Sequence, residues 1–457
     1  MPDGRSPELP EVQAFLASFP DTVAVDVFFA DLSGVIRGKR YPIEDLPRIW
    51  TDGLTFPASV FLLDTTGRSH DPGGKGFSDG DPDALGQPIP GSLQPVPWAE
   101  TPLGQLMLTF EVDGEPLAFE PRNVLKRAVD RLKELDLRPV VAFELEFYLL
   151  DRERGPGRTP QPPYSPITRQ RDAISQVYGM DRVDSFGPLL QDIVTTCRRQ
   201  GIPTGAISAE YAPGQFEINL RHVTDPLLAA DQSVMFKRAV KGVARKHGMQ
   251  ATFMAKPYPE EAGSGLHMHV SLLDREGRNV FDGGTRTASE TLLHAMGGFL
   301  AVMPEAMAFL APNVNSYRRF EPNIFVPISR SWGFENRSTA LRVPMGDGAS
   351  RRIECRVPGA DANPYLALAV LLAGIHHGIV NRIDPGKPHE GNATEAFDPA
   401  LPMRPRKALE VLESSRVLPL YLGSDYPRLY AACKLAEYDE FDWLISPQEY
   451  DWYLQAE

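Results

Sequence analysis

Four short segments of this chain place charged or polar residues at every second position, with apolar residues between them. They are VAFELEFYLL (141–150), GQFEINL (214–220), GLHMHVSL (265–272) and RRIECRV (351–357). Because successive side chains of a β-strand point to opposite faces, each segment is predicted to be a strand with one polar and one apolar face. Glu144 and Glu146 then share a face, as do His267 and His269.

If the apolar faces pack under helices, the polar faces converge on one cavity rich in carboxylates, imidazoles and guanidinium groups. Carboxylates held that close together repel one another strongly unless cations lie between them. The Glu and His side chains suit Mg²⁺ or Mn²⁺, whereas zinc would favour Cys or a larger set of His. Nearby Arg suit carboxylate and phosphate oxygens, which Arg binds bidentately. The combination predicts phosphoryl transfer from a nucleotide to a carboxylate.

Each motif also has an ordinary structural interpretation. A strand with alternating Glu is commonly a half-solvated strand, and a Pro-Gly turn between Glu210 and Glu217 fits a solvated hairpin. The paired His of LHMH are more often structural or zinc-related, and SYRRF (316–320) alone passes as basic surface. The G-S-G before LHMH lacks the Lys of a P-loop. We favour the metal centre because all of these features occur together in one chain.

The composition excludes several classes of function. A net charge of -13 argues against a nucleic-acid partner, since binding a phosphate backbone needs a basic face. The three Cys fit no metal or redox spacing, and the N-terminal segment has no apolar signal region, so reduced cytoplasmic thiols are expected. The longest apolar run, 365–380, is short for a membrane span and predicts a buried helix. We therefore expect a soluble, cytoplasmic protein with no membrane partner.

The chain is long enough for two domains. Residues 22–39 alternate like paired strands, and a Gly-, Pro- and Asp-rich region over 66–102 is predicted to be a long loop. Pro121 begins an amphipathic helix, and beyond it strands alternate with capped helices. We predict an α+β fold with an N-terminal domain over 1–117 and a catalytic domain over 118–457.

A series of longer motifs occurs in order along nearly the whole chain. They are E-x-E on a strand, E-(x)6-E around P-G-Q, G-S-G-x-H-x-H, N-S-Y-x-R, N-R-S-x-x-x-R-x-P, R-I-E-x-R and A-N-P-Y-L. This highly specific series resembles the glutamine synthetases in their bacterial type I form. The resemblance implies a β-grasp-like N-terminal domain and a catalytic domain with a strand-built funnel. It also implies a homo-oligomer of two stacked hexameric rings, with each active site between neighbouring subunits.

Carried over position by position, the resemblance implies a role for each polar residue, with at least two metal ions per site. One metal would be held by Glu146, Glu210 and Glu217. A second would be held by Glu144, His267 and Glu354. The carboxylates of glutamate would be bound by Arg319 and Arg356, and the transferred phosphoryl group would face Arg337 and Arg342. The ATP site would be lined by His269, Ser271 and Arg352. The glutamate amino group would meet the backbone of Gly263. The family usually has an Asn directly before this Gly, whereas this chain has Ala262.

Two departures from the family pattern concern the ammonium site. Glutamine synthetases bind ammonium with an Asp in an F-D-G-S-S stretch and a Glu in a loop after N-S-Y-x-R. Here Pro57 takes the Asp position and Phe325 takes the Glu position. Both replacements are apolar, which favours an acceptor with methylene groups over a small hydrated cation. Glu321 is our candidate for a replacement carboxylate, and a solvent-facing side chain is its alternative interpretation.

The leading interpretation is an ATP-dependent ligase that joins the γ-carboxylate of L-glutamate to an organic amine through γ-glutamyl phosphate. The chain resembles the branch that makes γ-glutamyl derivatives of polyamines such as putrescine, or of monoamines. One alternative is a glutamine synthetase with a divergent ammonium site. Another is a non-catalytic relative, against which the retention of every metal-ligand position argues.

The sequence leaves several points open. It does not identify the amine, the residue that deprotonates it, or the choice between Mg²⁺ and Mn²⁺. The family's adenylylation loop, N-L-Y-D-L, corresponds to 391–402, where this chain has no Tyr. Control by adenylylation is therefore not expected.

Overall fold

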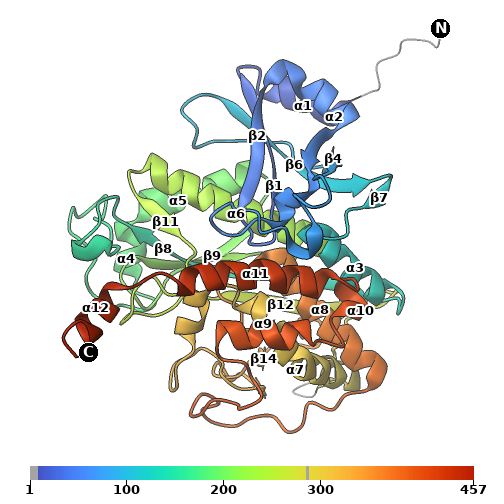
Figure 1. The fold of residues 1–457 in the computed structure, drawn as a ribbon, viewed down its shortest axis with the longest axis vertical. Coiled ribbons are helices and arrows are strands. Elements are labelled where there is room, and N and C mark those ends of the chain that lie inside the picture. Colours follow the sequence, from blue (N-terminus) through green and yellow to red (C-terminus); the bar gives the residue numbers. More distant parts are fainter. Residues whose placement is uncertain (1–8, 285–287, 457) are drawn as a thin grey trace.

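The computed structural model describes residues 9–284 and 288–456, which form two β-sheets with helices around them (Figure 1). The first sheet is built from strands between residues 24 and 116, and the second from strands between residues 138 and 355. Separate sheets with helices packed on them constitute an α+β fold, so the predicted fold class is confirmed.

The N-terminal sheet has seven strands in the order β2-β1-β6-β4-β3, with β5 and β7 paired to β6. They are β1 (Ala24–Ala30), β2 (Ile36–Pro42), β3 (Leu54–Pro57), β4 (Asp83–Pro88), β5 (Gln94–Pro95), β6 (Leu103–Val112) and β7 (Glu115–Pro116). β1 and β2 form the antiparallel pair predicted over 22–39, and β1 runs parallel to β6. The parallel pair among antiparallel strands agrees with a β-grasp-like sheet.

The prediction of a loop over 66–102 is wrong in part, because the region contains β4, which lies between β3 and β6. Ala84 of β4 is buried, and a Cβ on Gly86 would meet Leu108 and Phe110 at 2.8 Å. Only glycine lets the two strands pack this closely. The composition conceals the strand because pairing with neighbouring strands, rather than local propensity, selects it.

The second sheet has eight strands in the order β13-β14-β15-β12-β8-β10-β9, with β11 paired to β8. They are β8 (Arg138–Leu150), β9 (Thr204–Ala209), β10 (Gln215–Leu220), β11 (Gln250–Thr252), β12 (Leu266–Leu273), β13 (Trp332–Phe334), β14 (Leu341–Val343) and β15 (Ile353–Cys355). The four alternating segments of the sequence are therefore strands β8, β10, β12 and β15, although β15 is regular over only part of 351–357.

The first two helices lie beside the N-terminal sheet, and the later ones begin at residue 121 (Figure 1). The helices are α1 (Pro10–Ser18), α2 (Leu46–Asp52), α3 (Pro121–Lys133), α4 (Met180–Ser185), α5 (Gly187–Arg199), α6 (Pro226–Lys246), α7 (Glu290–Leu310), α8 (Pro364–Asn381), α9 (Pro405–Glu413), α10 (Pro419–Leu422), α11 (Tyr426–Asp442) and α12 (Pro447–Tyr453). α7 and α8 are long and apolar enough to cross a membrane, yet most of each is buried inside the protein. The buried helix predicted for 365–380 is thus confirmed.

Aromatic packing determines which face of the second sheet is apolar. The ring of Phe147 in β8 has its centroid 6.4 Å from those of Phe216 in β10 and Phe236 in α6. All three rings are buried. Glu146 and Glu217 adjoin Phe147 and Phe216 in sequence, so the period of two directs both carboxylates to the opposite face. Burial of the rings therefore fixes the direction of the carboxylates.

Buried polar contacts join the helices to one another and to the N-terminal sheet. Arg122 of α3 donates to Asp231 of α6 at 2.9 Å, and the hydroxyl of Tyr365 in α8 donates to the same carboxylate at 2.6 Å. Asn363, which caps α8, donates to the carbonyl of Asp31 after β1 at 2.9 Å. The Asp231 carboxylate thus holds three helices together.

Replacing Asp231 with Ala is expected to destabilise the protein by about 3 kcal/mol, because Arg122 would keep its charge in a buried position without a partner. A lower midpoint of thermal unfolding measures this loss. The matched control is Glu134→Ala, which breaks an exposed pair with Arg131 at 3.3 Å and should cost about 0.5 kcal/mol or less. Equal effects of the two substitutions would contradict the account of Asp231.

Candidate active site

Strand register places the predicted carboxylates beside one another. Glu217 of β10 lies directly opposite Glu146 of β8, and Glu144 of β8 lies opposite His267 of β12. Directly opposed residues in an antiparallel pair have Cβ atoms about 4.5–5.5 Å apart and share a face. The pairing of three strands therefore produces a cluster of carboxylates with one imidazole among them.

Opposed polar residues continue on two further strands, starting two positions further along β12, and we call the whole series the row. His269 of β12 lies opposite Glu354 of β15, which lies opposite Arg342 of β14. Arg342 Nη1 donates to one oxygen of Glu354 at 2.6 Å, and Arg356 Nη1 donates to the other at 2.5 Å. Burial alone would raise the pKa of Glu354, but His267, His269 and the two guanidinium groups lower it to about 2. Glu354 is therefore an ionised carboxylate at neutral pH.

The opposite end of the row holds more negative charge than its neighbours neutralise. Burial, together with repulsion from Glu144, Glu146 and Glu210, raises the pKa of Glu217 to about 9. Burial and repulsion from Glu146 likewise raise the pKa of Glu210 to about 7. Oxygen donors with one or two imidazoles are the ligands that Mg²⁺ and Mn²⁺ accept, so the residues fit a divalent cation. Binding a cation there would release the protons that these carboxylates hold.

Two compact groups of possible ligands share Glu144. One group brings atoms of Glu144, Glu217 and His267 within 4.8 Å of one another, and the other brings together Glu144, His269 and Glu354. Within the described part of the chain, Glu146 and Glu210 belong to neither group. Glu146 Oε2 instead accepts from the backbone of Gly265 at 2.9 Å and from Gln215 at 3.1 Å. The grouping thus differs from the two ligand sets that the family resemblance implies.

The two His of β12 have different neighbours. Arg352 Nε donates to His269 Nδ1 at 3.1 Å, so His269 Nε2 carries the ring proton, and this atom lies 3.0 Å from Glu144 Oε1. A protonated ring nitrogen has no lone pair for a metal. His267 Nδ1 lies 3.5 Å from Glu144, and its Nε2 lies 3.9 Å from Glu146. This geometry favours His267 over His269 as a metal ligand.

Arg319 is positioned to bind an anion. Its side chain is 2% exposed, its Nη1 donates to the carbonyl of Val357 at 3.2 Å, and its buried Nε has no hydrogen-bond partner among the residues described. A Cβ on Gly263 would meet Arg319 Cγ at 2.7 Å, so glycine is needed at 263 for Arg319 to lie there. A buried donor without a partner costs about 1–3 kcal/mol. The unpaired N–H therefore indicates a position for a bound carboxylate or phosphate.

The remaining predicted residues lie in several places. Ser271 follows His269 on the same face of β12 and is half-buried. Glu321 is largely exposed and lies 3.5 Å from Lys256 Nζ. Phe325 is 73% exposed. Pro57 ends β3 in the N-terminal sheet, so within one chain the structure does not place it in the sheet that carries the row.

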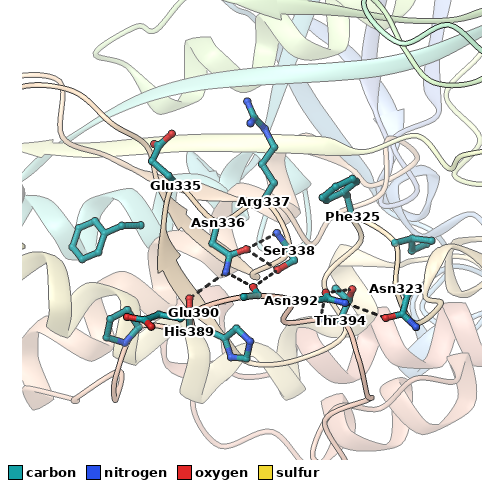
Figure 2. A pocket seen from close by; sticks show the side chains of 14 residues that line it. Asn323, Phe325, Glu335, Asn336, Arg337, Ser338, His389, Glu390, Asn392 and Thr394 are labelled. Carbon is teal, nitrogen blue, oxygen red and sulfur yellow. Dashed lines mark hydrogen bonds between the residues drawn. The ribbon is translucent and has the colours of Figure 1, made fainter.

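A cavity of about 840 Å³ adjoins the row (Figure 2). It is lined by 323–325, 334–338, 388–392 and Thr394, and it contains the predicted Phe325 and Arg337. The backbone carbonyl of Arg337 accepts from Arg356 Nε at 3.0 Å, which connects the cavity wall to the row. Sequence reasoning missed the segment 388–392, because its Pro, His and Gly residues are typical of an ordinary loop.

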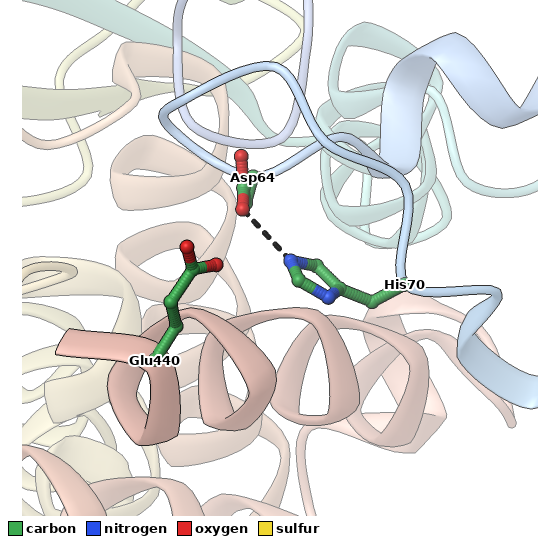
Figure 3. A group of neighbouring side chains, drawn as sticks. All are labelled: Asp64, His70 and Glu440. Carbon is green, nitrogen blue, oxygen red and sulfur yellow. Dashed lines mark hydrogen bonds and ion pairs between the residues drawn. The ribbon is translucent and has the colours of Figure 1, made fainter. Parts of the chain in front are cut away.

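A second group of acidic and His side chains lies apart from the row, between the loop after β3 and α11 (Figure 3). Asp64 Oδ2 lies 2.7 Å from His70 Nε2, and Asp64 Oδ1 accepts from the backbone of Thr66 and Arg68 at 2.8 and 2.9 Å. Glu440 is paired with the side chain of Arg68. Both carboxylates of this group already accept hydrogen bonds or ion pairs from the protein. The group therefore connects the loop to α11, and it lacks the unneutralised carboxylates of the row.

Comparison with known proteins identifies close relatives. Residues 118–453 match the family described as glutamine synthetase, catalytic domain. The chain is 44% identical over 446 residues to gamma-glutamylputrescine synthetase PuuA of Escherichia coli K12, covering 97% of this chain and 94% of that protein. It is 32% identical to the glutamate–isopropylamine ligase of a Pseudomonas species, covering 93% of each.

A solved structure of a GmaS/ADP complex has the same fold. It superposes with a TM-score of 0.82 at 28% identity, covering 97% of this chain and 99% of that one. The family match spans most of the chain, and the relatives align along almost its full length. This chain therefore belongs to the glutamine synthetase family.

Proposed function

We propose that this chain is an ATP-dependent ligase that joins the γ-carboxylate of L-glutamate to an organic amine. The observation that carries the proposal is the row of opposed Glu, His and Arg across five strands, with the buried and unpaired Nε of Arg319 nearby. The row suits phosphates with their cations, and Arg319 suits a substrate carboxylate. The names of the two relatives, which pair a glutamyl group with putrescine or isopropylamine, support the same reaction.

Each site residue is proposed to act through its charge. Mg²⁺ or Mn²⁺, with at least two ions per site, would be held by Glu144, Glu146, Glu210, Glu217, His267 and Glu354. When bound, such ions neutralise phosphate charge and draw the two anionic substrates together. The carboxylates of glutamate would be held by Arg319 and Arg356, with the backbone of Gly263 at its amino group. The transferred phosphoryl group would face Arg337 and Arg342, and the ATP site would be lined by His269, Ser271 and Arg352.

The reaction follows from the poor electrophilicity of a carboxylate. An oxygen of the γ-carboxylate attacks the γ-phosphorus of ATP, and ADP leaves. The amine nitrogen then attacks the acyl carbon, and phosphate departs with that carboxylate oxygen. An alkyl ammonium has a pKa of about 10, like Lys, so a nearby carboxylate must accept its proton before attack. Glu321 is our candidate for this base, and Lys256 is its partner in the absence of substrate.

The acceptor is proposed to be an organic amine rather than ammonium. Phe325 lines the cavity beside Arg337 and offers an apolar surface where an ammonium site would need a carboxylate. Pro57 would act in the same way from the N-terminal sheet of a neighbouring subunit. We further propose that the enzyme is a cytoplasmic homo-oligomer of two stacked hexameric rings. The family match over 118–453 supports a domain division near residue 118.

The amine preference is tested by ADP release with glutamate, ATP and Mg²⁺ against ammonium, ethylamine, isopropylamine, ethanolamine, putrescine and spermidine. We expect kcat/KM for the best organic amine to exceed that for ammonium by at least about tenfold, because each buried methylene contributes 10-fold or more in an apolar site. If ammonium is the best substrate, the chain is a glutamine synthetase and the proposed preference for an organic amine is wrong. Failure of every acceptor, with ATP still bound, would favour a non-catalytic relative.

The metal role is tested by Glu217→Gln in protein stripped with EDTA. The raised pKa of Glu217 keeps its carboxyl protonated at neutral pH, so the neutral amide should leave the unfolding midpoint of the metal-free protein nearly unchanged. Saturating Mn²⁺ at about 100 times its Kd should stabilise the wild type by about 2.7 kcal/mol, and this gain should fall sharply in the variant. The control is Glu260→Gln, an exposed carboxylate outside the row. Equal stabilisation of both variants by Mn²⁺ would contradict a role for Glu217 in metal binding.

A further inference from the structure

The cavity beside the row has room for more than the reacting nitrogen of an amine. Its volume of about 840 Å³ is within the range of pockets that enclose whole small-molecule ligands. One wall carries Glu335, which accepts from Arg342 Nη2 at 3.2 Å, and Arg342 in turn donates to Glu354 of the row at 2.6 Å. A molecule in this cavity therefore lies next to the residues proposed to face the phosphoryl group.

Glu390 lies in this cavity on a segment that is fixed on both sides. Asn336 Nδ2 donates to the carbonyl of His389 at 3.1 Å and to that of Gly391 at 2.8 Å (Figure 2). The backbone nitrogen of His389 donates to the carbonyl of Trp332 at 2.7 Å. One side chain of the N-R-S motif thus holds the carbonyls of the residues on either side of Glu390. The carboxylate is consequently presented from a fixed position, although it belongs to a loop.

The Glu390 carboxylate is uncommitted, unlike the other acid of the cavity. Glu335 is occupied by Arg342 and by the backbone of Met345. Glu390 makes no hydrogen bond or ion pair with any residue in the described ranges. Arg337, the one Arg among the described residues that line the cavity, extends away from the Glu390 segment in Figure 2. The cavity therefore contains a free negative charge with no protein cation assigned to it.

Two aromatic rings complete the surroundings. Phe325 and Phe334 both line the cavity and are 73% and 39% exposed. Aromatic faces pack against methylene groups and attract ammonium ions. A chain of methylenes with a positive charge at each end therefore matches this cavity better than either a monoamine or an anion does.

We propose that Glu390 binds the second ammonium group of an α,ω-diamine acceptor, and that it thereby sets the preference for diamines over monoamines of equal length. The inference rests on the proposed ligase function and names the class of its acceptor. The reacting nitrogen lies toward Arg337 and Arg342, the methylenes lie along Phe325 and Phe334, and the distal ammonium meets Glu390. Glu390 takes no part in the chemical step, so it is a specificity-determining residue.

The test compares putrescine with n-butylamine, which has the same carbon chain and one ammonium fewer. Both are assayed on full-length wild type, Glu390→Gln and Glu395→Gln, with glutamate, ATP and Mg²⁺ saturating. Glu395 is a matched control because it is exposed on the same loop and does not line the cavity. A hydrogen bond to a charged group contributes about 1.5–3 kcal/mol, so Glu390→Gln should raise KM for putrescine about 10- to 100-fold. Its kcat for putrescine should change little.

The comparison between the two amines distinguishes a loss of putrescine binding from a general loss of activity. In the wild type, KM should be lower for putrescine than for n-butylamine, and Glu390→Gln should remove most of that difference while changing KM for n-butylamine less than about twofold. Glu395→Gln should match the wild type with both amines. An unchanged putrescine KM in Glu390→Gln, or an equal loss with both amines, would overturn the proposal. Turnover of both amines without discrimination would overturn it and leave the proposed organic-amine ligase intact, whereas turnover of neither amine would overturn that ligase function as well.

Discussion

Repulsion among carboxylates is the constraint on which the rest of this structure depends. The register of β10, β8 and β12 places Glu217, Glu146 and Glu144 beside one another, and burial of the aromatic rings on the opposite face prevents them from turning away. Burial, and after it the repulsion from Glu144 and Glu146, raises the pKa of Glu217 in the absence of cations. Divalent cations bound there would remove the repulsion that this sheet otherwise carries.

Guanidinium groups lie beside the same carboxylates, where we propose that the anionic substrates bind. His267, His269, Arg356 and Arg342 lower the pKa of Glu354, whereas the buried Nε of Arg319 has no partner among the residues described. The acceptor end follows a different principle, since apolar rings and one free carboxylate face a cavity at the edge of the row. In our proposal the metal ligands lie mainly on regular strands, whereas Arg319 lies in a 3-10 turn and the acceptor is selected by loops.

Much of this arrangement could be predicted from the sequence, because a period of two fixes the face of each side chain locally. The alternating segments are strands, and the helix over 365–380 is buried as expected. Strand β4 could not be predicted, because its Gly86 is selected by a partner strand distant in sequence. The family resemblance already assigned His267 rather than His269 to the metal, but the tautomer of His269 required the position of Arg352, and the proposed role of Glu390 required the contacts of Asn336. Long-range contacts of this kind leave no local pattern.

The central claim is that this row of residues converts the γ-carboxylate of glutamate into an acyl phosphate. Glutamate labelled with oxygen-18 in its γ-carboxylate tests it most directly, with ATP, Mg²⁺ and the best amine, and with mass spectrometry of both products. The account predicts that each turnover transfers one labelled oxygen to inorganic phosphate and leaves the other in the γ-glutamyl amide. Release of unlabelled phosphate would show that ATP is hydrolysed by water without activation of glutamate, and would contradict the account.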